Sequence, residues 1–130
     1  MQPLTFFGRV EKGEGMAKRL GCPTANIAIE QGAVIPALGV YVGETLFEGK
    51  QYPSLVCIND GRTGYRLKME VHLFDVNREF IGKHLTVNLL EKLRDLVAFE
   101  GEDKMSKMVE QDLKTARDWF AKHAGIDEKS

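Results

Sequence analysis

The stretch KMEVHLF, residues 68 to 74, alternates apolar and polar side chains. The apolar set is Met69, Val71 and Leu73, and the polar set is Lys68, Glu70 and His72. A period of two residues is typical of a strand with one face in the core and the other at the surface. The stretch therefore predicts a half-buried strand, over residues 68–76, with the carboxylate of Glu70 on its polar face.

Five more β-rich runs flank this strand, and turn residues separate them. They cover residues 4–10, 24–30, 39–47, 52–58 and 84–90. Turn-forming segments such as NDGRTG, residues 59 to 64, lie between the runs. Short strands at regular spacing favour an antiparallel barrel or sandwich.

The last quarter of the chain has a helical period instead. Its apolar residues are Met105, Met108, Val109, Leu113, Ala116 and Phe120. This spacing predicts an amphipathic helix over about residues 103–123, with Asp103 as the cap and Gly125 just past the end. We expect the apolar stripe to pack against the barrel and not to line a ligand site.

Composition limits the kinds of partner. The chain has 130 residues, a formal net charge of −1 and only 8% aromatic residues. We expect one domain over residues 1–130, a monomer that binds small molecules, and neither nucleic acid nor membrane as partner. The N-terminus has no signal-peptide pattern, which indicates a cytoplasmic protein. Cys22 and Cys57 fit no metal-ligand spacing, and we interpret them as buried free thiols.

The segment GEGMAKRLGCPTAN, residues 13 to 26, combines glycines with cations. Gly13, Gly15 and Gly21 allow close backbone approach to a ligand, and Lys18 adds positive charge. Backbone N–H groups and cations together can hold a phosphate. A plain surface loop explains the same residues, and the segment matches neither a Walker A motif nor a dinucleotide fingerprint.

Two oxygen-bearing side chains follow this segment. Pro23 fixes a backbone angle, and the pleat then places Thr24 and Asn26 on one face of the next strand. Such neutral oxygens suit a magnesium ion that takes its other ligands from water and phosphates. The alternative is that both side chains satisfy nearby backbone groups.

The order of these motifs resembles the riboflavin kinase, or flavokinase, family. The resemblance runs through FFGRVEKGEG, RLGCPTANI, IPALGVYVG, MEVHLFD, FIGKHLTVNLLEKLR and MVEQDLKTAR. It implies a closed six-stranded antiparallel Greek-key barrel, spanning about residues 4–94, with the C-terminal helix packed outside. The implied reaction transfers the γ-phosphate of ATP to riboflavin and gives FMN and ADP, with Mg²⁺ or another divalent cation as cofactor.

The resemblance also assigns site residues. Glu70 matches the catalytic carboxylate, and Arg94, in EKLRD, matches a flavin-binding arginine of a flap. Thr24 and Asn26 match the magnesium and phosphate contacts. The nucleotide site would comprise Gly13, Gly15, Lys18, Gly21, Pro23, Thr24 and Asn26. His72 is interpreted as structural. Since the chain starts at the kinase boundary, we expect no adenylyltransferase half and no FAD synthesis.

One loop departs from the family pattern. Family members carry an N-P-T-F/Y element before the catalytic strand, and INDGRTGYRLK stands there in this chain. A flavin- or nucleotide-binding module without catalysis is therefore an alternative on the same barrel. An oligonucleotide-binding barrel is a further alternative, but the low aromatic content and the near-neutral charge disfavour it.

Overall fold

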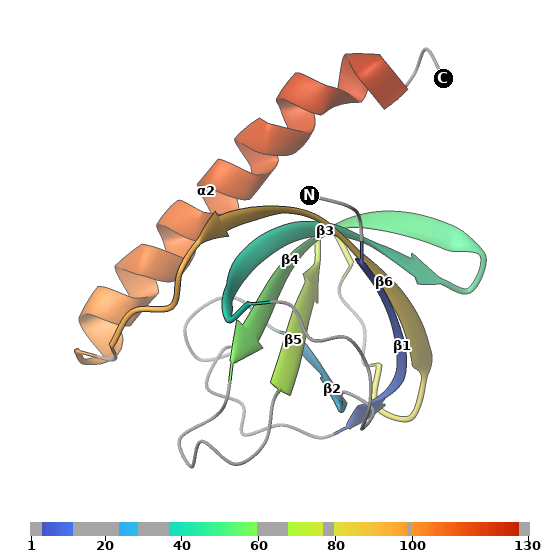
Figure 1. The fold of residues 1–130 in the computed structure, drawn as a ribbon, viewed down its shortest axis with the longest axis horizontal. Coiled ribbons are helices and arrows are strands. Elements are labelled where there is room, and N and C mark those ends of the chain that lie inside the picture. Colours follow the sequence, from blue (N-terminus) through green and yellow to red (C-terminus); the bar gives the residue numbers. More distant parts are fainter. Residues whose placement is uncertain are drawn as a thin grey trace.

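The computed structural model describes residues 4–11, 24–28, 37–59, 68–76, 80–98 and 100–127. Within them lie six strands and one helix (Figure 1). The elements are β1 (Leu4–Glu11), β2 (Ala25–Ala28), β3 (Gly39–Phe47), β4 (Lys50–Asn59), β5 (Lys68–Leu73), β6 (His84–Arg94) and α2 (Glu102–Asp127).

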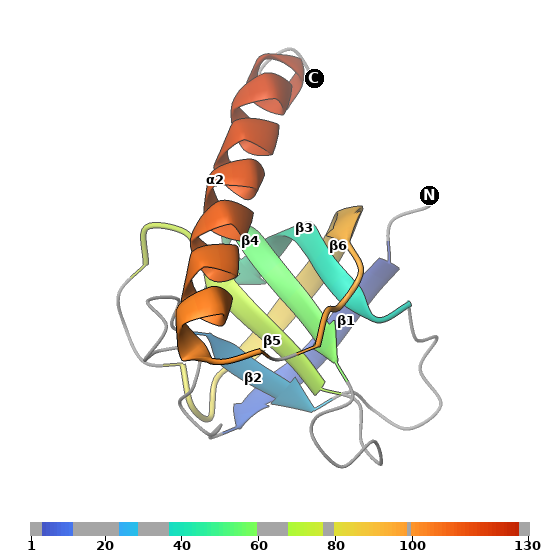
Figure 2. The same ribbon diagram turned by 90° about the vertical axis from the view of Figure 1, so that its left-hand side faces the viewer.

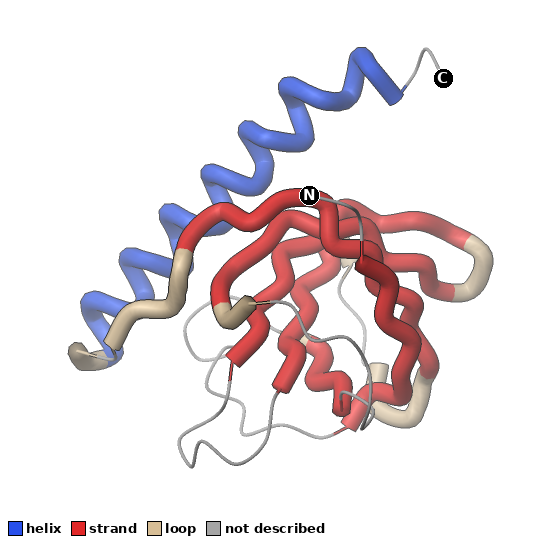
Figure 3. The backbone as a smooth tube through the Cα atoms, in the orientation of Figure 1, coloured by secondary structure: helices blue, strands red, loops and turns tan. Residues whose placement is uncertain are grey.

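The strands close into a barrel in the order β1-β2-β5-β4-β3-β6. Every neighbouring pair is antiparallel. β3, β4 and β5 follow one another as neighbours, while β2, which precedes β3 in the chain, lies beside β5. This is a Greek-key connection. Figure 3 shows the strands wrapped around one interior, with the helix outside them. The predicted six-stranded barrel is confirmed.

The barrel interior is the main hydrophobic core. On β5 the side chains of Met69, Val71 and Leu73 are buried, and those between them are only half-buried. The other strands contribute Val10, Ala25, Ile27, Tyr41, Phe47, Val56, Ile58, Leu85, Val87 and Leu89 to the same cluster. The alternation predicted from KMEVHLF is confirmed, and it directs Glu70 to the outer surface.

A second apolar cluster joins α2 to the outside of the barrel. Figure 2 shows the helix running along the outside of the strands. The helix contacts β3, β4 and β6. Buried Ala116, with Val109, Leu113 and Phe120, packs against barrel residues such as Leu55. The predicted role of the helical stripe as core is confirmed.

Several predicted ends were wrong, each for a local reason. β6 continues to Arg94, beyond the predicted end at residue 90, because its charged last residues still pair with β3. β5 ends at Leu73, since Asp75 has a positive φ of 61° and turns the chain. β4 is longer than residues 52–58, because the tight turn at residues 48–49 lets its pairing with β3 begin at Lys50.

The helix limits also differ from the prediction. α2 begins at Glu102, and the Met105 N–H donates to the Gly101 carbonyl, so Asp103 lies inside the first turn and is not the cap. The helix runs to Asp127, past Gly125, because backbone helix propagation tolerates one glycine at a cost of about 1 kcal/mol. Within the described part of the chain, no helix combines the length and apolarity that a membrane span requires.

Candidate functional site

One cross-strand row on the outer face of the barrel joins three of the candidate site residues from the sequence. Asn26 is the register partner of Glu70, and Glu70 that of Cys57. Cys57 pairs with Val40, and Val40 with Arg94. We call Asn26, Glu70, Cys57, Val40 and Arg94 the outer row. The fold therefore brings Asn26, Glu70 and Arg94, far apart in sequence, to one face.

Glu70 lies in the middle of a polar group on β2, β4 and β5. Its Oε2 atom accepts a hydrogen bond from Nδ2 of Asn59, at 3.3 Å. The register places Asn26 beside it on the other side, where the Cβ atoms of directly opposed residues lie about 5 Å apart. Glu70 is half-buried. The carboxylate is thus held by a neighbour and still reaches the surface, as a proton-accepting group needs to do.

Cys57 is a free thiol between the two ends of the row. Its pKa is raised from 9.0 to about 11, first by burial and then by the nearby Glu70 carboxylate. The Asn59 side chain, whose Nδ2 lies 3.7 Å from the sulfur, and the Arg94 guanidinium act in the opposite direction. The thiol is therefore neutral near pH 7 and serves as an uncharged spacer between a carboxylate and a guanidinium.

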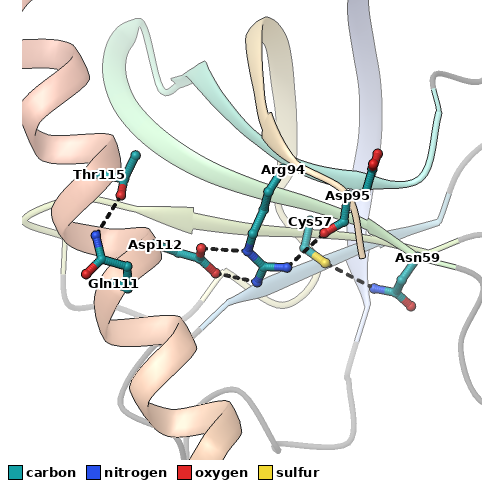
Figure 4. Close-up of polar contacts among 7 residues, drawn as sticks. All are labelled: Cys57, Asn59, Arg94, Asp95, Gln111, Asp112 and Thr115. Atoms are coloured by element: carbon teal, nitrogen blue, oxygen red, sulfur yellow. Dashed lines mark hydrogen bonds and ion pairs between the residues drawn. The ribbon is translucent and has the colours of Figure 1, made fainter. Parts of the chain in front are cut away.

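Arg94, at the last position of β6, forms a two-pronged ion pair with the helix (Figure 4). Its Nε donates to Oδ1 of Asp112 at 2.7 Å, and its Nη2 donates to Oδ2 at 2.6 Å. Nη1 donates to the backbone carbonyl of Asp95 at 3.0 Å. The hydrogen bond to Asp112 raises the pKa of Arg94, so the group is charged at any working pH.

Asn26 on β2 and Thr24, directly before that strand, both face away from the core. Both are half-buried, whereas Ala25 and Ile27 between and after them are buried. This confirms the predicted division of the two faces. Among the described residues, no three His, Cys, Asp or Glu side chains gather as a metal-binding group. The side-chain oxygens of Thr24 and Asn26 are the neutral groups that could hold a divalent cation here, together with waters and ligand phosphates.

Some of the predicted site lies outside the described residues. Gly13, Gly15, Lys18, Gly21 and Pro23 belong to that part, as does Cys22. The roles given to these residues stay predictions. His72 lies within the structure and packs edge-on against Phe74, with ring centroids 5.2 Å apart. That contact agrees with its interpretation as a structural residue.

Two residues of this region had no role in the sequence interpretation. Asp112 is 7% exposed and accepts two hydrogen bonds from Arg94. A signal was present: a carboxylate at 112 falls inside the apolar stripe formed by Val109, Leu113 and Ala116. Asn59 belongs to the segment INDGRTGYRLK, and the sequence assigns it no role because its contact with Glu70 depends on the pairing of β4 with β5.

The chain is similar in sequence to known proteins. The sequence model of the family described as "Flavokinase: Riboflavin kinase" matches residues 1–120. The bifunctional riboflavin kinase/FMN adenylyltransferase of Escherichia coli K12 is 36% identical over 121 residues, which are 91% of this chain and 38% of the relative. The chain thus spans less than half the length of the curated relatives that it matches.

Solved structures share the fold. A crystal structure described as a macrolide-efflux protein from Streptococcus pneumoniae has a TM-score of 0.80 at 28% identity, covering 90% of this chain and 39% of that one. Riboflavin kinase from Trypanosoma brucei has a TM-score of 0.67 at 21% identity, covering 94% of this chain and 82% of that one. At the lower identity the likeness extends to the fold alone.

Proposed function

The chain belongs to the riboflavin kinase family, and we propose that it transfers the γ-phosphate of ATP to the ribityl 5′-hydroxyl of riboflavin. The products are FMN and ADP. The observation that carries the proposal is the outer row, in which Glu70 has the oxygen donor Asn26 as its register partner and Arg94 lies farther along the same face.

Glu70 is the proposed catalytic residue. In the reaction a bond forms between the 5′-oxygen and the γ-phosphorus, and the bond from that phosphorus to the bridging oxygen of ADP breaks. The hydroxyl proton passes to the Glu70 carboxylate, which also orients the hydroxyl for in-line attack. The hydrogen bond from Asn59 limits the rotation of the carboxylate and keeps it at the surface of β5.

Thr24 and Asn26 are the proposed protein ligands for Mg²⁺. Their hydroxyl and amide oxygens fit an ion that prefers oxygen and keeps several waters. When bound, such an ion neutralises charge on the transferred phosphate. The residues themselves supply the anchor point: the start of β2 holds both side chains on the face that carries Glu70.

Two further substrate contacts are proposed from the sequence. The loop with Gly13, Gly15, Lys18, Gly21 and Pro23 is the proposed phosphate cradle, on the basis of its glycines and cation. Arg94 is the proposed contact to the flavin. A single domain over residues 1–130, a monomeric state and a cytoplasmic location also stay predictions from the sequence.

A non-catalytic flavin- or nucleotide-binding module is the second candidate. The observation in its favour is the segment INDGRTGYRLK, which stands in place of the family's N-P-T-F/Y element. Product formation separates the two candidates. The purified chain is incubated with riboflavin, ATP and Mg²⁺, and FMN is sought by chromatography, with a chelator control. Formation of FMN that stops on chelation supports the kinase. Riboflavin binding without FMN under any divalent metal supports the module.

A further inference from the structure

We propose that Asp112 of α2 is a positioning residue for the flavin site, because it fixes the Arg94 guanidinium at the end of the outer row. The inference rests on the proposed function and extends it: the C-terminal helix becomes part of the substrate site. The substrate group concerned is a hydrogen-bond acceptor of riboflavin.

The first argument is the geometry of the ion pair. Two parallel hydrogen bonds of 2.7 and 2.6 Å join Arg94 to Asp112. The side chains are 27% and 10% exposed, respectively. A bidentate pair fixes the plane of the guanidinium as well as its location. Asp112 therefore determines the direction in which the other N–H groups of Arg94 point.

The second argument concerns the N–H groups of Arg94 that are not used by Asp112 or Asp95. A guanidinium has five N–H groups. Nε and Nη2 each use one for Asp112, and Nη1 uses one for the Asp95 carbonyl. Among the described residues, no acceptor takes the second N–H of Nη1 or of Nη2. Figure 4 shows Arg94 reaching from β6 with Asp112 on one side and Cys57 on the other. These two donors are thus available next to the outer row.

The third argument is the backbone beneath Arg94. A Cβ atom built on Gly39 would lie 2.6 Å from the Arg94 carbonyl oxygen, so only glycine lets β3 approach so closely. The main chain of Arg94 is thereby held by β3 and its side chain by α2. Both restraints act on one residue, which is the arrangement expected for a group that must meet a ligand in one orientation.

A role in docking the helix alone explains the Arg94–Asp112 ion pair less well. Apolar contacts of Ala116, Val109, Leu113 and Phe120 already dock the helix. Ion pairs taken out of water add little to stability, because desolvation offsets their attraction. A second pair, Arg117 to Asp75 at 3.5 Å, also links the helix to the barrel, but it is exposed and lies off the outer row. It offers a matched control.

The test compares three single variants, and the Arg94→Lys/Asp112→Asn double variant, with the wild-type chain. Asp112→Asn removes the carboxylate charge and keeps the side-chain shape. Arg94→Lys keeps the positive charge and removes the planar guanidinium that makes two parallel hydrogen bonds. Asp75→Asn breaks the control pair, and asparagine tolerates the positive φ at that position. For each protein, the riboflavin dissociation constant is measured by flavin fluorescence without nucleotide. KM for riboflavin, KM for ATP and the melting temperature are measured as well.

We expect Asp112→Asn to raise the riboflavin dissociation constant and KM by about tenfold or more, as for a lost charge-assisted contact. KM for ATP should stay within about twofold. The Arg94→Lys/Asp112→Asn double variant should lose little more than either single variant, since both act through one contact. Asp75→Asn should bind riboflavin like the wild type.

Two results would overturn the inference. In one, Asp112→Asn lowers the melting temperature but binds riboflavin like the wild type, which assigns the pair to helix docking alone. In the other, Asp75→Asn weakens riboflavin binding as much as Asp112→Asn does. If Asp112→Asn does not fold, Asp112→Glu takes its place, since its extra methylene displaces the guanidinium while the charge stays. A wild-type chain that neither binds riboflavin nor forms FMN would instead contradict the proposed function.

Discussion

Glu70 is the residue on which the proposed chemistry depends most directly. Glu70→Gln keeps the side-chain shape and an oxygen that can still accept from Asn59, but it removes the basic carboxylate. The turnover number should fall by about 10²- to 10⁴-fold, with little change in melting temperature. FMN formation and a thermal melt measure the two effects. A folded variant with more than about a third of the wild-type turnover would remove Glu70 from the mechanism, since that loss is under about 1 kcal/mol of barrier.

Thr24 and Asn26 are predicted to act on the nucleotide and not on the flavin. Asn26→Ala or Thr24→Val should raise KM for Mg-ATP, because an ion held by few protein oxygens loses an anchor. Riboflavin binding without nucleotide should change little. The control is Asn88→Ala on β6, an outward side chain that accepts a hydrogen bond from Thr5 at 2.6 Å and lies off the outer row. Unchanged ATP kinetics in both site variants would assign the two residues to strand structure.

The Cys57 thiol predicts a dependence of stability on alkaline pH. Its pKa is about 11 in the folded chain and 9.0 when unperturbed. Above pH 9 the unfolded thiol loses its proton while the folded thiol keeps it, so stability falls as pH rises from 9 to 11. The loss at the upper end amounts to about 2 to 3 kcal/mol.

Comparison with Cys57→Ala isolates this effect from other groups that titrate at alkaline pH, such as Tyr41, whose pKa is raised by burial. The free energy of unfolding is measured by urea denaturation at several pH values. The wild-type curve should fall more steeply than the variant curve between pH 9 and 11. Parallel curves for the two proteins would show that the folded-state pKa of Cys57 is not raised.

At the scale of elements, the position of Arg94 at the end of the outer row depends on the close pairing of β3 with β6. A Cβ atom on Gly43 would lie 2.8 Å from the Asn88 carbonyl oxygen and 3.1 Å from Cγ2 of Val56. Gly43→Ala should therefore push the two strands apart and cost about 1 to 3 kcal/mol of stability. Gln51→Ala, at an exposed position of β4, should change stability by less than about 0.5 kcal/mol. Equal urea midpoints for the two variants would contradict this account of the strand contact.

Strand and helix positions could be predicted from periodicity, whereas their ends could not. The alternation on β5 and the stripe on α2 both correspond to real buried faces. The end of β6 was predicted too early, because its charged last residues suggest solvent although they pair with β3. The helix was predicted to end at about residue 123, just before Gly125, because a glycine commonly terminates a helix but does not always do so.

At the scale of the whole molecule, the site depends on barrel closure. The order of the strands brings Asn26, Glu70 and Arg94 into one row, and local sequence patterns do not contain that order. The order of the sequence motifs suggested the six-stranded barrel and Glu70 as the catalytic carboxylate. The pairing of Arg94 with Asp112 required the helix to be packed against the barrel, since 18 residues separate the two in the chain. The sequence therefore supplies the chemistry of the site, and the packing supplies its arrangement.

The most direct measurement of the central claim is the stoichiometry of phosphoryl transfer. The purified chain is incubated with riboflavin, Mg²⁺ and ATP labelled in the γ-phosphate, and labelled FMN and ADP are quantified together, with Glu70→Gln in parallel. The account predicts that label appears in FMN in equal amount to ADP, and that the variant forms both products at least about 100-fold more slowly. ADP formed without labelled FMN, or riboflavin bound without either product, would contradict the assignment of this barrel as a riboflavin kinase.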